Sequence, residues 1–189
     1  MIAAIVTGDH AAVSALLVET PELAMASSTS EAFLEAIRHQ LYRGDTGLHI
    51  AAAGYRVTMV SDLVACGAEV GARNRRGAQP LHYAADGQPG SALWDHEAQR
   101  ATVERLLAAG ADPDAQDKGG ASPLHRAVRT RCAAAVAALL EGGADTSLRN
   151  KHGSTPGDLA TRTTGRGGSG SPAARAQLAE IRALLSREG

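Results

Sequence analysis

The chain has 189 residues, a formal net charge of −1 at pH 7 and an aromatic content of only 3 %. This length is enough for one domain, and the near-neutral charge excludes a general electrostatic attraction to nucleic acids or membranes. No stretch approaches the roughly 20 apolar residues of a membrane-spanning helix, and residues 1–13 lack the basic start of a signal peptide.

The first predicted element is an incomplete pair of helices at residues 1–25. Residues 2–6 are apolar enough for a short first helix, and the run from Gly8 to Leu17 has its apolar residues at the spacing of a second helix. Pro21 stops this second helix, because proline cannot continue the backbone hydrogen bonding. The pair is interpreted as a terminal cap on a stack of similar units, since it is too thin to bury a core alone.

Residues 26–43 are predicted to be an insertion between this cap and the next unit. Ser27 to Ser30 form a polar break. Within residues 31–42, apolar side chains then recur at helical spacing, at Phe33, Leu34, Ile37 and Leu41. We therefore expect an extra short helix that packs on the first repeats.

Three complete helix pairs are predicted next, at residues 44–74, 75–117 and 118–150. The third pair is the clearest. Its first helix begins at Ser122, which can cap it, and at Pro123, whose missing N–H costs nothing at the first helical position. Its second helix spans residues 132–141 with apolar side chains on one face, and the two glycines that follow favour the left-handed turn that ends a helix.

The last predicted unit spans residues 151–189. A loop rich in Gly, Ser and Arg, at residues 161–171, separates its short first helix from a final helix at residues 173–187. The final helix has Leu178, Ile181, Leu184 and Leu185 on one face. Its other faces are charged or small, which is typical of a C-terminal cap.

One motif recurs through these units. His49, His82, His125 and Asp158 occupy the same position in TGLH, QPLH, SPLH and TPGD, at intervals of 33, 43 and 33 residues. The longer interval is the same period with ten extra residues, which lie within residues 86–97. A period of 33 with a T-P-L-H-x-A-like motif is typical of ankyrin repeats, and the chain resembles that family over nearly its whole length.

The resemblance implies an all-α ankyrin-repeat solenoid of about five stacked repeats, including divergent caps at residues 1–25 and 151–189. It also implies that His49, His82 and His125 hydrogen-bond the backbone of the neighbouring turn. A zinc site is the competing interpretation. Equivalent residues in stacked helices lie roughly 10 Å apart, however, and cannot converge on one ion. We therefore expect no metal and no cofactor.

Two weaker motifs receive structural interpretations. Cys66 and Cys132 fall in non-adjacent repeats, so we expect free thiols, a reducing compartment and a cytoplasmic location. A redox role for Cys132 at a helix start is the alternative. Residues 165–170 match the letters G-x-G-x-x-G, but a helix precedes them instead of the strand that a dinucleotide site needs, so a flexible loop is predicted.

The candidate partner-binding surface also comes from the resemblance. In ankyrin-like repeats, the hairpin tips and the exposed side of the first helices form a concave face that binds partners. The residues carried over to that face are Tyr42, Arg43, Arg75, Arg76, Lys118, Arg126, Arg129 and Lys151. Such a row of cations would steer an acidic partner toward the groove. The alternative is a solvated hairpin edge whose charges only keep the stack soluble.

Trp94, the only tryptophan, is a secondary candidate for partner binding. It lies beside Asp95 and His96 in the insertion of the second repeat, and tryptophan is a common interface anchor. The alternative is that Trp94 folds back over the helix ends and closes the gap that the insertion makes. Asp95 and His96 alone supply neither a nucleophile nor an oxyanion donor, so no catalytic residue is assigned.

The expected function is therefore binding of another protein, with an acidic surface, by a monomer that has no catalytic activity. Nucleic-acid binding through the same cations is one alternative, and the near-neutral charge and the lack of a nucleic-acid motif argue against it. A small-molecule or enzymatic site near the Trp94 loop is the other, and it predicts a closed apolar pocket containing Asp95 and His96. The Ala, Gly and Arg content is typical of a GC-rich genome, so we expect a bacterial source.

Overall fold

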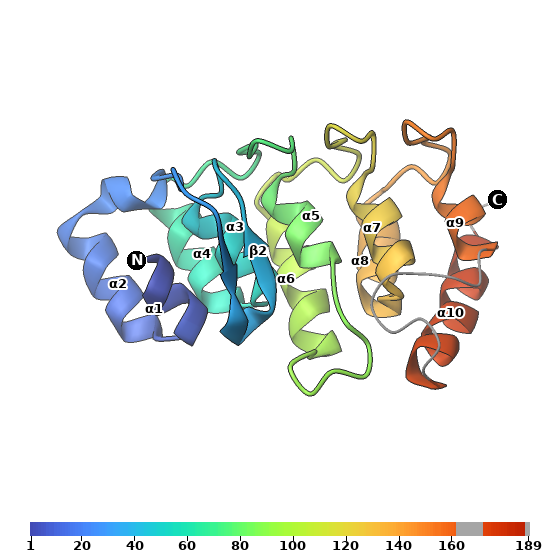
Figure 1. Ribbon diagram of the computed structural model, residues 1–189, viewed down its shortest axis with the longest axis horizontal. Helices are drawn as coiled ribbons and strands as arrows, with labels where there is room; N and C mark the ends of the chain where they lie inside the picture. Colours follow the sequence, from blue (N-terminus) through green and yellow to red (C-terminus); the bar gives the residue numbers. More distant parts are fainter. Residues whose placement is uncertain (162–171, 188–189) are drawn as a thin grey trace.

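The computed structural model describes residues 1–161 and 172–187 as one stack of helix pairs (Figure 1). The first helices of the pairs are α1 (Ile2–Thr7), α3 (Gly47–Ala53), α5 (Pro80–Ala85), α7 (Pro123–Thr130) and α9 (Pro156–Thr161). The second helices are α2 (His10–Glu19), α4 (Val57–Ala65), α6 (His96–Ala108), α8 (Ala133–Glu141) and α10 (Pro172–Leu185). A short 3-10 turn, Pro21–Ala24, follows α2. The all-α solenoid predicted from the sequence is confirmed.

The first helices form an inner row and the second helices an outer row. In the inner row α3 packs on α5, α5 on α7 and α7 on α9, while α4, α6, α8 and α10 follow one another in the outer row. Each pair therefore buries its apolar surface against the pairs before and after it, which is what holds a solenoid of thin repeats together. None of the described helices is both long and apolar enough to span a bilayer.

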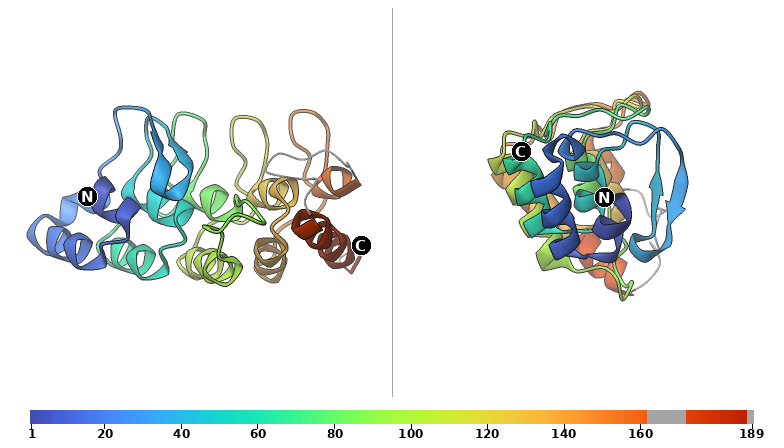
Figure 2. Two further views of the ribbon diagram at one scale, coloured as in Figure 1. Left: turned by 60° about the horizontal axis from the view of Figure 1, so that its bottom comes forward. Right: turned by 90° about the vertical axis from the view of Figure 1, so that its left-hand side faces the viewer.

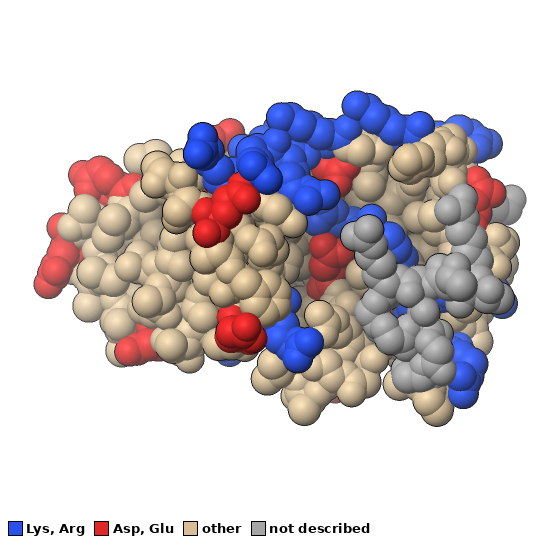
Figure 3. Space-filling model, viewed as in Figure 1, with Lys and Arg blue, Asp and Glu red and all other residues tan. Residues whose placement is uncertain are grey.

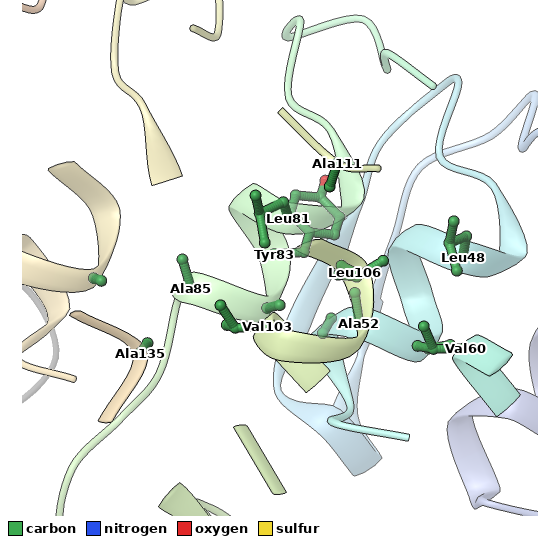
Figure 4. Packing of buried hydrophobic residues seen from close by; sticks show 14 of the residues in the cluster. Leu48, Ala52, Val60, Leu81, Tyr83, Ala85, Val103, Leu106, Ala111 and Ala135 are labelled. Carbon is green, nitrogen blue, oxygen red and sulfur yellow. The ribbon is translucent and has the colours of Figure 1, made fainter. Parts of the chain in front are cut away.

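The core is built mainly from alanine and branched aliphatic residues. Every residue of α3 and α5 is buried. Figure 4 shows Leu48 and Ala52 of α3, Leu81 and Ala85 of α5, and Val103 of α6 among the buried residues of this core. Small alanine side chains let neighbouring helices approach closely, so a chain with few aromatic residues still reaches dense packing.

The prediction of an extra helix within residues 26–43 is wrong. The segment forms an antiparallel hairpin of β1 (Ala32–Leu34) and β2 (His39–Leu41), joined by a 3-10 turn at Glu35–Ile37. Ala32 pairs with Leu41, Phe33 with Gln40 and Leu34 with His39.

The base of the insertion explains this outcome. The Ser28 N–H donates to the Asp45 carbonyl (2.7 Å), and the Gly44 N–H donates to the Ser28 carbonyl (2.8 Å). Because both ends of the insertion are held side by side, the chain must return to its starting point, which an antiparallel hairpin does at once. A single helix of this length would be marginal without a full packed face.

The β1–β2 hairpin lies against the inner row (Figure 2). The His39 ring stacks on Tyr83 of α5, with ring centroids 4.2 Å apart. Leu41 points into the core and is 4 % exposed, whereas Phe33 is 52 % exposed. The insertion therefore covers part of the inner-helix face of repeats one and two.

Candidate functional site

The hairpin loops that lead into α3, α5, α7 and α9 project from one edge of the stack (Figure 2). They carry six of the predicted partner-binding residues. We call these six the tip row: Tyr42, Arg43, Arg75, Arg76, Lys118 and Lys151. Figure 3 shows Lys and Arg side chains gathered along this edge of the molecule.

Main-chain hydrogen bonds join successive tips. The Arg75 N–H donates to the Arg43 carbonyl (2.9 Å), the Lys118 N–H to the Arg76 carbonyl (2.8 Å), and the Lys151 N–H to the Gly119 carbonyl (2.9 Å). Residues that lie 32 or 42 positions apart in the chain thus become neighbours. The structure brings together the predicted residues of the tip row as one continuous edge.

Each tip is also fixed internally by one polar side chain. Asn74 Oδ1 accepts the N–H groups of Arg76 (2.9 Å) and Ala78 (3.1 Å). Asp117 and Asn150, at the equivalent positions, make the same pair of bonds in their own tips. The tips are therefore preorganised, and a partner would not have to order them on binding.

The side chains at the two ends of the tip row differ in their contacts. The Arg76 guanidinium lies 5.0 Å from the Tyr42 ring centroid and donates to Tyr42 Oη (3.1 Å). Arg75 forms an ion pair with Glu31 of the insertion at 2.8 Å. Lys118 and Lys151 are exposed, and neither is ion-paired within residues 1–161 and 172–187. Arg75 is therefore the one cation of the row that is neutralised by a carboxylate of the described residues.

The structure separates the other two predicted arginines from the tip row. The Arg126 side chain is only 9 % exposed, and its guanidinium lies 2.9 Å from both Asp86 Oδ2 and Asp117 Oδ2. Burial alone would raise the pKa of Asp117, but the hydrogen bond and charge of Arg126 outweigh burial and lower it. Arg129 is 40 % exposed and lies 3.8 Å from Asp86 Oδ1. Arg126 is thus a buried bridge between repeats instead of a surface cation.

The predicted role of the repeated histidines is confirmed. The Nε2 atoms of His49, His82 and His125 donate to the carbonyls of Ala78, Ala121 and Ser154, at 3.1, 3.0 and 2.9 Å. The Nδ1 atom of each ring accepts the backbone N–H at the start of its own helix. Each histidine therefore ties one helix start to the hairpin of the next repeat. Among the described residues, no group of His, Cys, Asp or Glu is arranged to hold a metal ion.

Asp158 replaces the histidine in α9, the last inner helix described. Its carboxylate accepts the Thr155 N–H (2.9 Å), which reproduces the local half of the histidine's role. An ionised carboxylate has no proton to donate, so Asp158 does not reproduce the bond that the histidine Nε2 makes to a carbonyl of the following hairpin.

A buried polar network at the first tip escaped the sequence-based predictions. Asp45 is fully buried and accepts hydrogen bonds from the Tyr42 N–H (2.6 Å), Asn74 Nδ2 (2.8 Å) and Tyr83 Oη (3.0 Å). The network fixes the first tip on α5. The signal in the sequence is a charged residue at a position where the following repeats have Ala78, Ala121 and Ser154.

Trp94 lines a pocket of about 520 Å³ between the two insertions. Its Nε1 donates to Gln99 Oε1 (2.8 Å), and Gln99 is itself buried and donates to the Ala84 carbonyl (2.9 Å). Trp94 is therefore half-buried and folded back onto the start of α6. This position corresponds to the second interpretation of Trp94, in which the side chain folds back over the helix ends instead of standing fully exposed.

The prediction that a pocket here would contain Asp95 and His96 is wrong. Asp95 caps α6 by accepting the N–H groups of Glu97 and Ala98, both at 3.0 Å, and both Asp95 and His96 are exposed. The ionisable residues that line the pocket come from other elements and include His39 and Asp86. The sequence could not place these two side chains together, because one lies on each insertion.

Gly87 is required at the floor of this pocket. A Cβ there would lie 2.6 Å from Cys132 Sγ, 2.8 Å from Trp94 Nε1 and 3.0 Å from Tyr55 Oη. Gly87→Ala should therefore lower the free energy of unfolding by about 1–3 kcal/mol and shift the emission of Trp94. Gly71→Ala is the control, because its Cβ would meet nothing closer than 3.8 Å. Equal unfolding midpoints for the two variants in urea would contradict this packing.

The remaining motifs are the two cysteines and residues 165–170. Cys66 and Cys132 are both free thiols. Burial raises the pKa of Cys132 to about 12, so its thiol stays protonated near neutral pH. Residues 165–170, predicted to form a flexible loop, lie outside the described residues.

Comparison with known families matches the central part of the chain. A sequence model of the ankyrin repeat matches residues 43–75 and 76–118. A second model, described as ankyrin repeats (many copies), matches residues 106–160. The two models together cover more than half of the chain. No curated protein matches it.

Proposed function

Because the chain belongs to the ankyrin-repeat family, whose repeats are generally protein–protein interaction modules, we propose that it binds a partner protein through the tip row. The partner's contact surface would be acidic, and the chain would act by binding alone, without catalysis.

The observation that carries the proposal is the main-chain ladder between tips, which aligns five cations along one edge. Within the part of the chain that the structure describes, Arg75 is the one residue of the row that is paired with a carboxylate, that of Glu31. An aligned set of exposed cations accelerates the encounter with an acidic surface and disfavours basic ones. Tyr42 adds an aromatic side chain, a residue type enriched at binding hot spots.

The β1–β2 hairpin narrows the region available to a partner. It covers the inner helices of repeats one and two, so that a partner would reach the tips there but not the helix surface beneath. Arg126 makes no contribution to the contact, because it is buried. The proposal therefore rests on the tips, and most of all on Lys118 and Lys151.

The lysine content of the chain provides a sharp test. Lys118 and Lys151 are the only lysines, so an amine-reactive photo-crosslinker attaches at the tip row and otherwise only at the α-amino group. Wild-type protein should crosslink its partner in extracts of the native host. The double variant Lys118→Glu with Lys151→Glu should bind the identified partner about tenfold more weakly, with unchanged thermal unfolding, because two attractive rim charges become repulsive.

The double variant Lys118→Arg with Lys151→Arg is the matched control. It keeps both charges and loses both attachment points in the tip row, so it should bind the partner at wild-type affinity while the crosslinks from the tip row disappear. Binding at equal affinity by the Glu and Arg double variants would contradict the proposal. Crosslinks to nucleic acid, with an affinity that falls steeply as salt rises, would replace it with nucleic-acid binding.

A further inference from the structure

The two insertions meet across a pocket that regular 33-residue repeats would not form. Its wall on one side is the turn and second strand of the β1–β2 hairpin, and on the other the loop at residues 86–94. The α3–α4 turn and the end of α7 complete it. Its volume, about 520 Å³, is in the range of pockets that bind small organic molecules.

Three residues that line the pocket carry a buried polar atom that lacks a hydrogen-bond partner among the described residues. The atoms are His39 Nε2, Arg56 Nε and Asp86 Oδ1. Buried polar groups in folded proteins almost always have a partner, and each unsatisfied one is costly. Three such atoms lie at one cavity, and a polar occupant could reach them through small movements of these side chains.

The charge and walls of the pocket indicate the kind of occupant. Three arginines line it, Arg38, Arg56 and Arg129, against a single carboxylate, that of Asp86. Asp86 is paired with Arg126 and lies 3.8 Å from Arg129. Arg56 donates to the Val6 carbonyl (3.5 Å). The excess charge is therefore positive, and guanidinium groups recognise carboxylates with particular geometric specificity.

The pocket lining also contains aromatic and aliphatic residues. Trp94, Tyr55, Ile37 and Leu93 line the cavity, and Leu93 is 59 % exposed. Trp94 is fixed by its bond to Gln99, so its ring offers a preformed stacking surface.

We propose that this pocket binds a small carboxylate with an aromatic ring. The carboxylate would lie beside Arg38 and His39, and the ring would lie against Trp94 and Leu93. A hydroxyl or amino group on the ligand would satisfy Asp86 Oδ1. This site is separate from the tip row and involves none of its residues, so the small molecule and the partner protein bind independently testable surfaces.

The single tryptophan makes the test direct, because Trp94 gives the only indole N–H signal in a nitrogen–proton correlation spectrum. Three probes of nearly equal shape are titrated into the chain: naphthaleneacetate, naphthaleneacetamide and naphthaleneethylamine. The carboxylate should shift the Trp94 signal and bind about tenfold more tightly than the neutral amide, since one charge-assisted hydrogen bond is worth about that factor. The cationic amine should bind weakest.

Variants separate the site from unspecific binding. Arg38→Asn and His39→Gln should each weaken binding of the carboxylate probe several-fold, and asparagine suits the left-handed backbone at position 38 (φ 48). Arg43→Gln, in the tip row, should leave it unchanged. Equal affinities for the three probes would contradict the proposed preference for a carboxylate. No shift of the Trp94 signal by any probe at millimolar concentration would mean that water alone fills the pocket.

Discussion

Replacing Arg126 with methionine should lower the free energy of unfolding by about 3–5 kcal/mol, because two largely buried carboxylates lose their shared cation. Asp86 and Asp117 each have an oxygen 2.9 Å from the guanidinium, and their side chains are only 21 % and 13 % exposed. Methionine retains much of the side-chain volume, so the lower free energy of unfolding would come mainly from the lost charge and less from a cavity. Urea denaturation followed by circular dichroism measures it.

Arg100→Met is the matched control on the outer row. Arg100 also bridges two carboxylates, those of Glu104 and Glu141, but its side chain is 35 % exposed and theirs 48 % and 62 %. Solvent screens such pairs, so the free energy of unfolding should fall by less than about 1 kcal/mol in this variant. Similar losses from both variants would mean that the Arg126 cluster is effectively solvated, and that Arg126 could serve as a surface cation.

The repeats and their histidines were predictable because one period fixes them. Once His49, His82 and His125 are aligned, every residue at the same offset is expected to fall on the same side of the stack. This is why Arg43 and Arg76, or Lys118 and Lys151, could be placed together from the sequence. The structure adds the backbone bonds that join their tips.

The insertions were not predictable, because they interrupt the period. Apolar spacing at Phe33, Leu34, Ile37 and Leu41 is compatible with a helix, and only the hydrogen bonds at the base of the segment favour the hairpin. The pocket depends on contacts between two such segments, residues 26–43 and 86–97. No local pattern specifies how far apart they lie in the fold.

Arg126 shows that the exposure of a residue cannot be predicted from its equivalent position in another repeat. Its position in α7 is equivalent to Tyr83 in α5, so the offset predicted an exposed inner-face residue. Whether such a residue is exposed depends on its neighbours, and here Asp86 and Asp117 of adjacent segments enclose it. The insertion stacks His39 on Tyr83 and so covers the same face one repeat earlier.

Acidification should destabilise the fold well above the pH at which carboxylates titrate. Burial, followed by the charge of Arg126, lowers the pKa of His82 from 6.5 to about 3. Burial also lowers the pKa of His49 and His125. Each Nδ1 atom accepts a backbone N–H, so a proton there would break the bond that caps the helix. The neutral rings are therefore part of what connects the repeats.

The sign follows from the lowered pKa. The unfolded chain binds protons on these rings below about pH 6.5 and the folded chain does not, so stability is complete above that pH and declines below it. For His82 the decline continues to about pH 3. Between about pH 7.5 and about pH 5, His82 alone should cost about 2 kcal/mol of unfolding free energy, with His49 and His125 acting in the same direction.

Urea denaturation at the two pH values measures this loss. His82→Gln should be less stable than wild type at the higher pH, because it loses a bond between repeats, and should lose about 2 kcal/mol less on acidification. His152→Gln, which replaces a histidine at an exposed tip, is the control for the substitution itself. If His82→Gln does not fold, the ring nitrogen signals of His82 in the wild type decide instead, since a ring protonated at about pH 5 in the folded chain would contradict the mechanism.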